Sequence, residues 1–259
     1  MLAQLEKSKL SGAVAAPPSK SVSHRLLICA GLAKGKSIVH GIAPSQDLLA
    51  TLDCLKAIGA KWTYENDTVV IEGTDVRTLS EDLFLPCRES GSTLRFFLPI
   101  CLLGNAKATL CGSERLFERP LEIYKNLCPK QGIQYESQKD RVCVKGRLLA
   151  DTYKIPGNVS SQFISGLLFA LPLLENDSII EILPPIESGY YVKLTIQALS
   201  EFGIAVKWLD ERTLFIKGNQ DYRPAEVTVE GDYSNAAVFD ALNYLGSVVS
   251  VTNLNADSM

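Results

Sequence analysis

Lys20 and Arg25 stand at the two ends of a serine-rich segment that follows Pro17 and Pro18. The prolines would end a strand, and the serines would begin a helix whose free backbone N–H groups and positive dipole end attract anions. The two basic side chains would add positive charge within about one turn. The segment predicts a cradle for a phosphate or carboxylate group, although alone it also fits a capping serine beside two solvated basic residues.

Two later segments repeat this hydroxyl-rich helix start. Residues 90–92 read Ser-Gly-Ser with an arginine at 95, and residues 160–162 read Ser-Ser-Gln. Equivalent ends of repeated units can converge on one surface. Together the three hydroxyl-rich helix starts predict a binding site for a polyanionic small molecule, which backbone N–H groups, serines and a few basic side chains would hold. Gly91 is either an ordinary turn glycine or a position where the backbone approaches that ligand closely.

Arg119 and His24 have suitable chemistry for a site, but each also fits a structural role. Arginine suits bidentate recognition of a carboxylate or phosphate, yet Arg119 has Glu118 and Glu122 nearby as ion-pair partners. His24 falls one turn inside the expected helix, which favours a packed, hydrogen-bonded ring over a general base.

The seven cysteines indicate reduced, buried thiols. They are odd in number, widely spaced and without a Cys-x-x-Cys pair, as expected of a protein in a reducing compartment. His24 and His40 are the only histidines and neither lies near a cysteine pair. We therefore expect no metal site.

The amino-acid composition limits the class of protein to which this chain can belong. The chain has 259 residues, 46% of them hydrophobic and 21% charged, with a formal net charge of -3. This describes a globular protein with a real core and no basic excess for nucleic acid or an anionic membrane. Residues 155–174 are uncharged but contain polar residues and two prolines, so we expect no membrane span. Residues 1–17 lack the apolar run of a secretory signal, which predicts a cytoplasmic protein.

The elements that would carry these residues repeat about every 70 residues. Helices are expected to start near Ser21, Asp47, Ser92, Glu118, Ser161, Gly189 and Ser234. β-Branched runs between them predict strands at 37–40, 61–65, 68–72, 108–111, 134–137, 141–145, 178–183, 206–209 and 213–217. Each unit reads β-α-β-α-β-β, in an α/β (α+β) fold of three complete units around one shared core.

A fourth unit is expected to open with strand 225–229, followed by the Ser234 helix and strand 248–251. Pro99 and Pro172 fall within two expected helices, where a proline removes a backbone donor.

Five segments, in order, resemble the motifs of 5-enolpyruvylshikimate-3-phosphate synthases. They are Lys20-Ser21-Val22-Ser23-His24-Arg25, Ser90-Gly91-Ser92-Thr93-Leu94-Arg95, Glu118-Arg119-Pro120, Ser160-Ser161-Gln162-Phe163 and Glu230-Gly231-Asp232-Tyr233-Ser234. The resemblance covers nearly the whole chain. It implies a cytoplasmic, monomeric full-length enzyme with two inside-out α/β barrel domains of the enolpyruvyl-transferase type, three repeats in each.

The resemblance also implies the ligands. The family transfers the enolpyruvyl group of phosphoenolpyruvate to the 5-hydroxyl of shikimate 3-phosphate and releases phosphate, without a metal or organic cofactor. The shikimate 3-phosphate residues would be Lys20, Ser21, Arg25, Ser160, Ser161 and Ser188. The phosphoenolpyruvate residues would be Lys20, Gly91, Arg119 and Gln162, with Lys20 a candidate for handling a proton.

The chain departs from the family pattern in four places. Residues 89–92 read Glu-Ser-Gly-Ser where many members have Asn-Ala-Gly-Thr, and Phe96 stands where many have proline. The surroundings of Ser188 match only loosely. The chain ends at Met259, where the family continues through the second domain that holds its main acid and base groups.

The resemblance thus divides the chain into residues 1–19, a strand of the split first domain; residues 20–230, a complete domain; and residues 231–259, the start of the return. We expect no turnover by this chain alone. The related transferase acting on UDP-N-acetylglucosamine, and a non-catalytic phosphate-ligand-binding module or remnant, are the alternatives.

Overall fold

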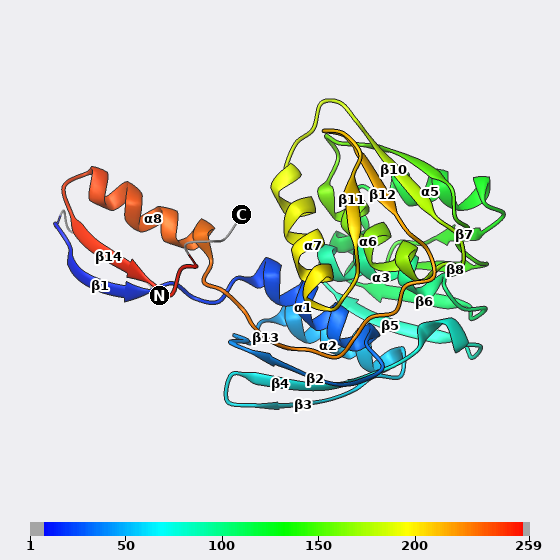
Figure 1. The fold of residues 1–259 in the computed structure, drawn as a ribbon, viewed down its shortest axis with the longest axis horizontal. Coiled ribbons are helices and arrows are strands. Elements are labelled where there is room, and N and C mark those ends of the chain that lie inside the picture. Colours follow the sequence, from blue (N-terminus) through cyan, green and yellow to red (C-terminus); the bar gives the residue numbers. More distant parts are fainter. Residues whose placement is uncertain (1–7, 256–259) are drawn as a thin grey trace.

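Three helices that begin at capping serines form the centre of the molecule. They are α1 (Lys20–Leu32), α3 (Gly91–Cys101) and α6 (Ser161–Ala170). The computed structural model describes residues 8–255, and in it these helices are buried over almost their whole length. This follows from their sequences, which are apolar on nearly every face. The sheets lie outside them (Figure 1).

The other helices are only half-buried and lie nearer the surface. They are α2 (Gln46–Ala57), α5 (Glu122–Lys130), α7 (Gly189–Glu201) and the single turn α4 (Glu114–Phe117). Two 3₁₀ turns, η1 (Val76–Thr78) and η2 (Leu171–Leu173), complete the set. Helix α3 packs on α6, α6 on α7 and α7 on α1, so the core is continuous.

Three four-stranded sheets have the same pattern of pairing: the first two strands are parallel and the others antiparallel. The first sheet is β13 (Glu226–Thr228), β2 (Gly35–His40), β4 (Thr68–Gly73) and β3 (Lys61–Glu65). The second is β5 (Leu83–Arg88), β6 (Ala108–Gly112), β8 (Arg141–Lys145) and β7 (Gln134–Ser137). The third is β9 (Thr152–Pro156), β10 (Ser178–Leu183), β12 (Thr213–Ile216) and β11 (Val206–Trp208). Alternate residues of the inner strands face the helices, as one-sided burial requires.

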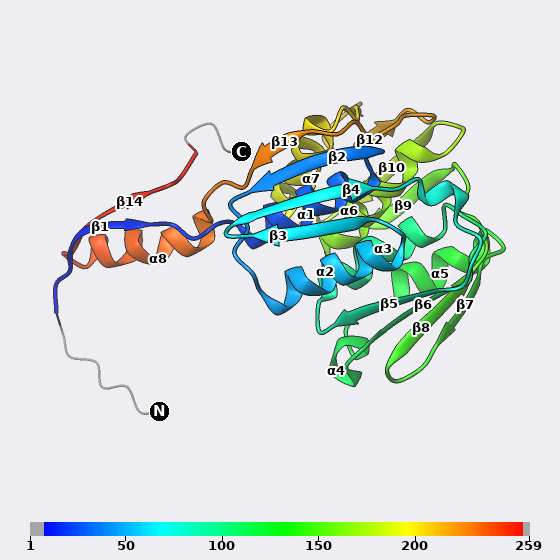
Figure 2. The same ribbon diagram turned by 90° about the horizontal axis from the view of Figure 1, so that it is seen from below.

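A smaller lobe extends from this body (Figure 2). It consists of β1 (Ser11–Ala15) paired in parallel with β14 (Val248–Thr252), and of α8 (Tyr233–Tyr244), which packs against β14. Two stretches of chain, residues 16–19 and 230–232, join the lobe to the body and are hydrogen-bonded to each other.

The mixed α/β fold and most predicted helix starts are confirmed. Helices α1, α2, α3, α6, α7 and α8 begin within one residue of the predicted positions. The helix predicted at Glu118 is wrong: α4 ends before it and α5 begins at Glu122. Pro120 explains the break, because proline disfavours helical backbone in the residue before it. Pro99 stands near the end of α3, and Pro172 lies in η2, beyond the end of α6.

The predicted fourth unit is corrected by the strand pairing. Strand β13, which was to open it, pairs in parallel with β2, Glu226 opposite Ile38, and completes the first sheet. Strands β5 and β9 were not among the predicted runs. Proline in each of these two strands weakens a local strand signal, and parallel pairing is a long-range property.

Candidate functional site

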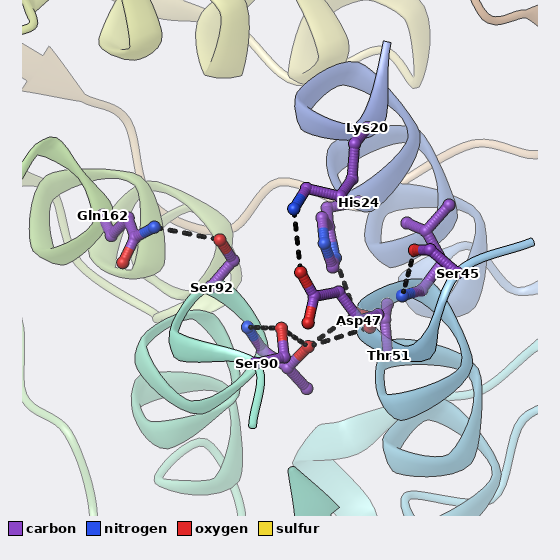
Figure 3. A network of polar contacts seen from close by, with 10 residues as sticks. Lys20, His24, Ser45, Asp47, Thr51, Ser90, Ser92 and Gln162 are labelled. Atoms are coloured by element: carbon purple, nitrogen blue, oxygen red, sulfur yellow. Dashed lines mark hydrogen bonds and ion pairs between the residues drawn. The ribbon is translucent and has the colours of Figure 1, made fainter. Parts of the chain in front are cut away.

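The N-termini of four helices lie close together (Figure 3). Ser19, Ser90 and Ser160 cap α1, α3 and α6, and each side chain accepts a hydrogen bond from a first-turn N–H group. Ser45 caps α2 in the same way. The first free N–H groups of these helices and their positive dipole ends make a region suited to anions.

Direct contacts between these helices show that the ends are neighbours. Lys20 Nζ lies 2.8 Å from Asp47 Oδ2 and joins the starts of α1 and α2. Gln162 Nε2 donates to Ser92 Oγ at 2.9 Å and joins α6 to α3. The structure therefore brings Lys20, Gly91 and Gln162, predicted from separate segments, into one region.

Lys20 is an exposed charged group at this site. Its side chain is 56% exposed and its partner Asp47 is 34% exposed. Because an exposed ion pair contributes little to stability, a bound phosphate could take the ammonium from Asp47 at small cost.

Arg25 is buried and held from three helices. Its donors reach Ser21 O (2.8 Å), Thr195 Oγ1 (2.8 Å), Tyr191 O (3.2 Å) and Ser165 Oγ (3.4 Å). The guanidinium also lies 5.3 Å from the ring centre of Phe96 and 5.8 Å from that of Tyr191. Burial lowers the pKa of Arg25 to about 10, opposed by Tyr191 and Cys29, so the group keeps its charge at neutral pH.

These partners take four of the five N–H groups of Arg25. Within residues 8–255, one N–H of Nη1 is therefore left for a ligand. The local sequence did not reveal Ser165, Tyr191 or Thr195, because all three are more than 100 positions from Arg25 in the chain.

Two arginines flank Gly91. A β-carbon at position 91 would lie 2.9 Å from Arg119 Nη1 and 3.1 Å from Arg95 Nη1. The absence of a side chain thus allows both guanidinium groups to reach the start of α3. Arg119 therefore lies at the same helix end as Gly91, while the close approach of a ligand to Gly91 stays a prediction.

Arg95, which the sequence analysis noted beside the second hydroxyl-rich helix start without assigning it to either substrate, also lies at this site. Its Nη1 donates to Gln162 Oε1 at 2.6 Å, its Nη2 donates to Pro120 O at 3.0 Å, and its guanidinium lies 5.1 Å from the ring centre of Phe163. Burial lowers the pKa of Arg95, and the neighbouring Arg119 adds to this. An anion between the two arginines would relieve that repulsion.

The predicted serines occupy three different settings. Ser160 caps α6, and Ser161 is buried in its first turn at 6% exposure. Ser188 precedes α7 with left-handed backbone, φ 58°, and makes no capping hydrogen bond. Its loop is tied to the segment before α6, since Glu187 N–H donates to Gly157 O at 3.0 Å.

A cavity of 70 Å³ opens beside this region. Its lining includes Ser19, Ser21, Tyr191 and Asp232, so α1, α7 and the connecting segment 230–234 meet there. A groove of 410 Å³ lies elsewhere, between α5 and β9.

The other residues that could carry chemistry are the cysteines, which are buried except for the half-buried Cys111 and Cys143. The cysteines are free thiols, and burial raises the pKa of Cys29, Cys54, Cys101 and Cys128, which makes their thiolates unavailable at neutral pH. Residues 8–255 contain no cluster of three or more metal-ligating side chains. No helix in that range has the length and apolar character to cross a membrane.

Known proteins resemble this chain over nearly all its length. It is 42% identical over 253 residues to 3-phosphoshikimate 1-carboxyvinyltransferase of Clostridium perfringens (strain 13 / Type A), an alignment covering 97% of this chain and 60% of the relative. The Clostridioides difficile (strain 630) enzyme is 38% identical over 264 residues, covering 97% and 60%. The chain thus spans 60% of the length of these curated relatives.

Solved structures with a similar fold include an EPSP synthase and another enolpyruvyl transferase. EPSP synthase from Acinetobacter baumannii superposes with a TM-score of 0.75 at 25% identity, covering 89% of this chain and 52% of that one. The enolpyruvyl transferase NikO from Streptomyces tendae shares the fold, with a TM-score of 0.67 at 16% identity over 89% of this chain and 54% of that one. The sequence model of the EPSP synthase (3-phosphoshikimate 1-carboxyvinyltransferase) family matches residues 5–259. With this match spanning the clustered helix starts and their arginines, the chain belongs to the EPSP synthase family.

Proposed function

We propose that this chain binds shikimate 3-phosphate and phosphoenolpyruvate as part of a 3-phosphoshikimate 1-carboxyvinyltransferase. The observation that carries the proposal is the meeting of the α1, α3 and α6 N-termini beside Lys20, Arg25, Arg95 and Arg119. Two polyanionic substrates repel each other, so a site that unites them needs several fixed cations and N–H donors.

Shikimate 3-phosphate would occupy the side of the site formed by α1, α6 and α7. Ser160 and Ser161 would hold its phosphate, with the free amides of α6. Arg25, through its remaining N–H, would meet another oxygen of the same ligand. Lys20, Ser21 and Ser188 complete the proposed set.

Phosphoenolpyruvate would occupy the side formed by α3 and the Arg119 loop. Arg119 and Lys20 would neutralise it, and the open space at Gly91 would let it reach the backbone. Gln162 is already oriented by Ser92 and Arg95, which leaves one N–H of its amide for this ligand.

The reaction joins the 5-hydroxyl oxygen of shikimate 3-phosphate to C2 of phosphoenolpyruvate. The hydroxyl loses its proton and C3 gains one, which gives a tetrahedral intermediate. This intermediate then loses a proton from C3 and expels phosphate from C2, so that the double bond of the enolpyruvyl group forms again. This chain's residues would bring the two substrates together and stabilise negative charge on both phosphates, which lowers the entropic and electrostatic parts of the barrier. Lys20 would be the candidate for handling a proton near phosphoenolpyruvate.

We also propose the finer architecture. Residues 20–230 form one domain of three repeated units, an inside-out barrel with helices within and sheets outside, and the shared sheet pattern supports this. Residues 1–19 and 231–259 belong to the other domain, the split first domain, which the β1–β14 pairing supports for the part lying in residues 8–255. By resemblance to the family, the full-length protein would be a cytoplasmic monomer.

Calorimetric titration of the 259-residue chain tests the proposal. We expect saturable binding of shikimate 3-phosphate, at least tenfold weaker binding of shikimate, and about tenfold weaker binding of shikimate 3-phosphate in Ser161→Ala and Lys20→Ala. Ser137→Ala is the matched control, because Ser137 is exposed in β7, at the outer edge of the second sheet. Preference for UDP-N-acetylglucosamine would overturn the substrate assignment. No binding by the folded chain would favour the non-catalytic remnant.

A further inference from the structure

Four buried side chains on three helices form one continuous line of hydrogen bonds beneath the anion site (Figure 3). His24 Nδ1 on α1 lies 2.8 Å from Thr51 Oγ1 on α2. Thr51 Oγ1 lies 2.9 Å from Thr93 Oγ1 on α3, and Thr93 Oγ1 lies 2.7 Å from Ser90 Oγ, the cap of α3. Each of the four residues is at most 2% exposed. We call this set the His24 chain.

The His24 chain has a direction, because each hydroxyl carries a single proton. The Thr93 hydroxyl donates to Ser90 Oγ at 2.7 Å, since its other acceptor, Asp47 O, lies 3.5 Å away, beyond the usual range of an O–H···O hydrogen bond. Thr51 must then supply the proton of the Thr51–Thr93 bond, and its oxygen must accept from His24. This reasoning assigns the proton of His24 to Nδ1.

The other ring nitrogen supports the same tautomer. Among the described residues, Nε2 of His24 is buried without a hydrogen-bond partner. With the proton on Nδ1, Nε2 is only a bare lone pair, whereas the other tautomer would bury an unpaired N–H, which is rarer in proteins. Burial also lowers the pKa of His24 to about 3, Asp47 opposing and Arg25 and Lys20 adding to the effect, so the ring is neutral.

We propose that His24 is a positioning residue of the anion site. Through Thr51 and Thr93 it orients the Ser90 hydroxyl, and with it the first turn of α3, where Arg119 lies beside Gly91. The inference rests on the proposed function, which assigns Gly91 to phosphoenolpyruvate. The role depends on the hydroxyl of Ser90, because an alanine at this position would have no hydroxyl to end the His24 chain.

The tautomer is tested directly by ¹⁵N NMR of the imidazole rings in the unliganded chain. There are two histidines, His24 and His40, so the His40→Gln variant assigns the signals. We expect His24 as the neutral Nδ1–H form. A neutral Nε2–H form would overturn the direction of the chain, and with it the proposal.

The positioning role is tested by a conservative and a disruptive substitution. Asparagine at position 24 can place an amide N–H where Nδ1–H stands, whereas leucine cannot. We expect the backbone amide signals of Gly91 and Ser92 to move in His24→Leu and to stay near their wild-type positions in His24→Asn. If both variants shift these amide signals, or if neither does, the positioning role is refuted. This result does not depend on the binding of any ligand.

Binding supplies the second readout. With shikimate 3-phosphate saturating, we expect phosphoenolpyruvate to bind about fivefold more weakly in His24→Leu and Thr93→Val, and within twofold of wild type in His24→Asn and the Ser137→Ala control. Thr93→Val keeps the test open if His24→Leu does not fold. Unchanged affinity in Thr93→Val contradicts the inference. Failure of wild type to bind either ligand would instead refute the proposed function, while the two NMR tests still decide the role of His24.

Discussion

At the scale of single residues, a methyl group added at Gly91 should weaken ligand binding while leaving the stability of the fold nearly unchanged. The β-carbon of Gly91→Ala would meet the mobile ends of Arg119 and Arg95, at 2.9 and 3.1 Å, and no backbone atom that close. The side chains can shift, so the free energy of unfolding should change by less than about 1 kcal/mol.

The shifted arginines would no longer fit the ligand. We expect phosphoenolpyruvate binding to weaken about tenfold in Gly91→Ala, whereas shikimate 3-phosphate binding stays within about twofold. Calorimetry of both ligands measures this difference. Equal losses for the two ligands would show that Gly91 does not separate their sites.

His24 should make stability depend on pH. A histidine in the unfolded chain titrates near pH 6.5, whereas burial lowers the pKa of His24 to about 3, with Asp47 opposing and Arg25 and Lys20 adding to the shift. Between these values the unfolded state binds more protons, so the free energy of unfolding falls as pH decreases from about 6.5 toward 3. Above about pH 6.5, His24 no longer lowers the free energy of unfolding through proton uptake by the unfolded chain.

Urea unfolding of wild type and His24→Asn at about pH 7 and about pH 5 tests this dependence. We expect the wild type to lose up to ~1.4 kcal/mol per pH unit more than the variant below about pH 6. Parallel pH profiles would mean that His24 takes up its proton at the same pH in the folded and the unfolded chain, which would contradict the lowered pKa.

At the scale of elements, Gly166 sets how closely α3 and α6 approach. A β-carbon there would lie 2.4 Å from Arg95 O and 2.5 Å from Tyr124 Oη, a hydroxyl that itself donates to Arg95 O at 2.7 Å. The backbone oxygen of Arg95 cannot move aside as easily as the end of a side chain. We therefore expect Gly166→Ala to lower the free energy of unfolding by about 1–3 kcal/mol.

Gly189→Ala is the matched control for Gly166→Ala. Gly189 also lies in a helix, but its nearest atom would be 3.5 Å away, an ordinary contact. Urea denaturation of the two variants compares the sites. Equal stability would show that α3 and α6 have room at Gly166.

The elements also show which features local sequence can predict. A capping serine acts on N–H groups within its own turn, so Ser19, Ser90 and Ser160 mark their helices from a few neighbouring residues. The pairing of β13 with β2 joins strands almost 190 positions apart, and nothing near residue 226 specifies it. The partners of Arg25 on α6 and α7 escaped prediction for the same reason.

At the scale of the whole molecule, the smaller lobe should be the least stable part of the chain described. It has one two-stranded sheet and one helix, and Val238, Tyr244, Leu245 and Val248 are exposed. So small a sheet buries little apolar surface. We therefore expect amides of β14 to exchange with solvent faster than those of β4, which lies inside a sheet over the core.

Hydrogen exchange followed by mass spectrometry measures that difference. Protection of β14 equal to that of β4 would show that the lobe and the body unfold as one unit.

The central claim, that the α1, α3 and α6 helix starts form one site for two anions, is tested most directly by a crystal structure of the 259-residue chain with shikimate 3-phosphate. The account predicts the phosphate at Ser160 and Ser161, with Arg25 and Lys20 in contact with the ligand. A ligand in the 410 Å³ groove between α5 and β9, or anywhere away from these helix starts, would contradict it.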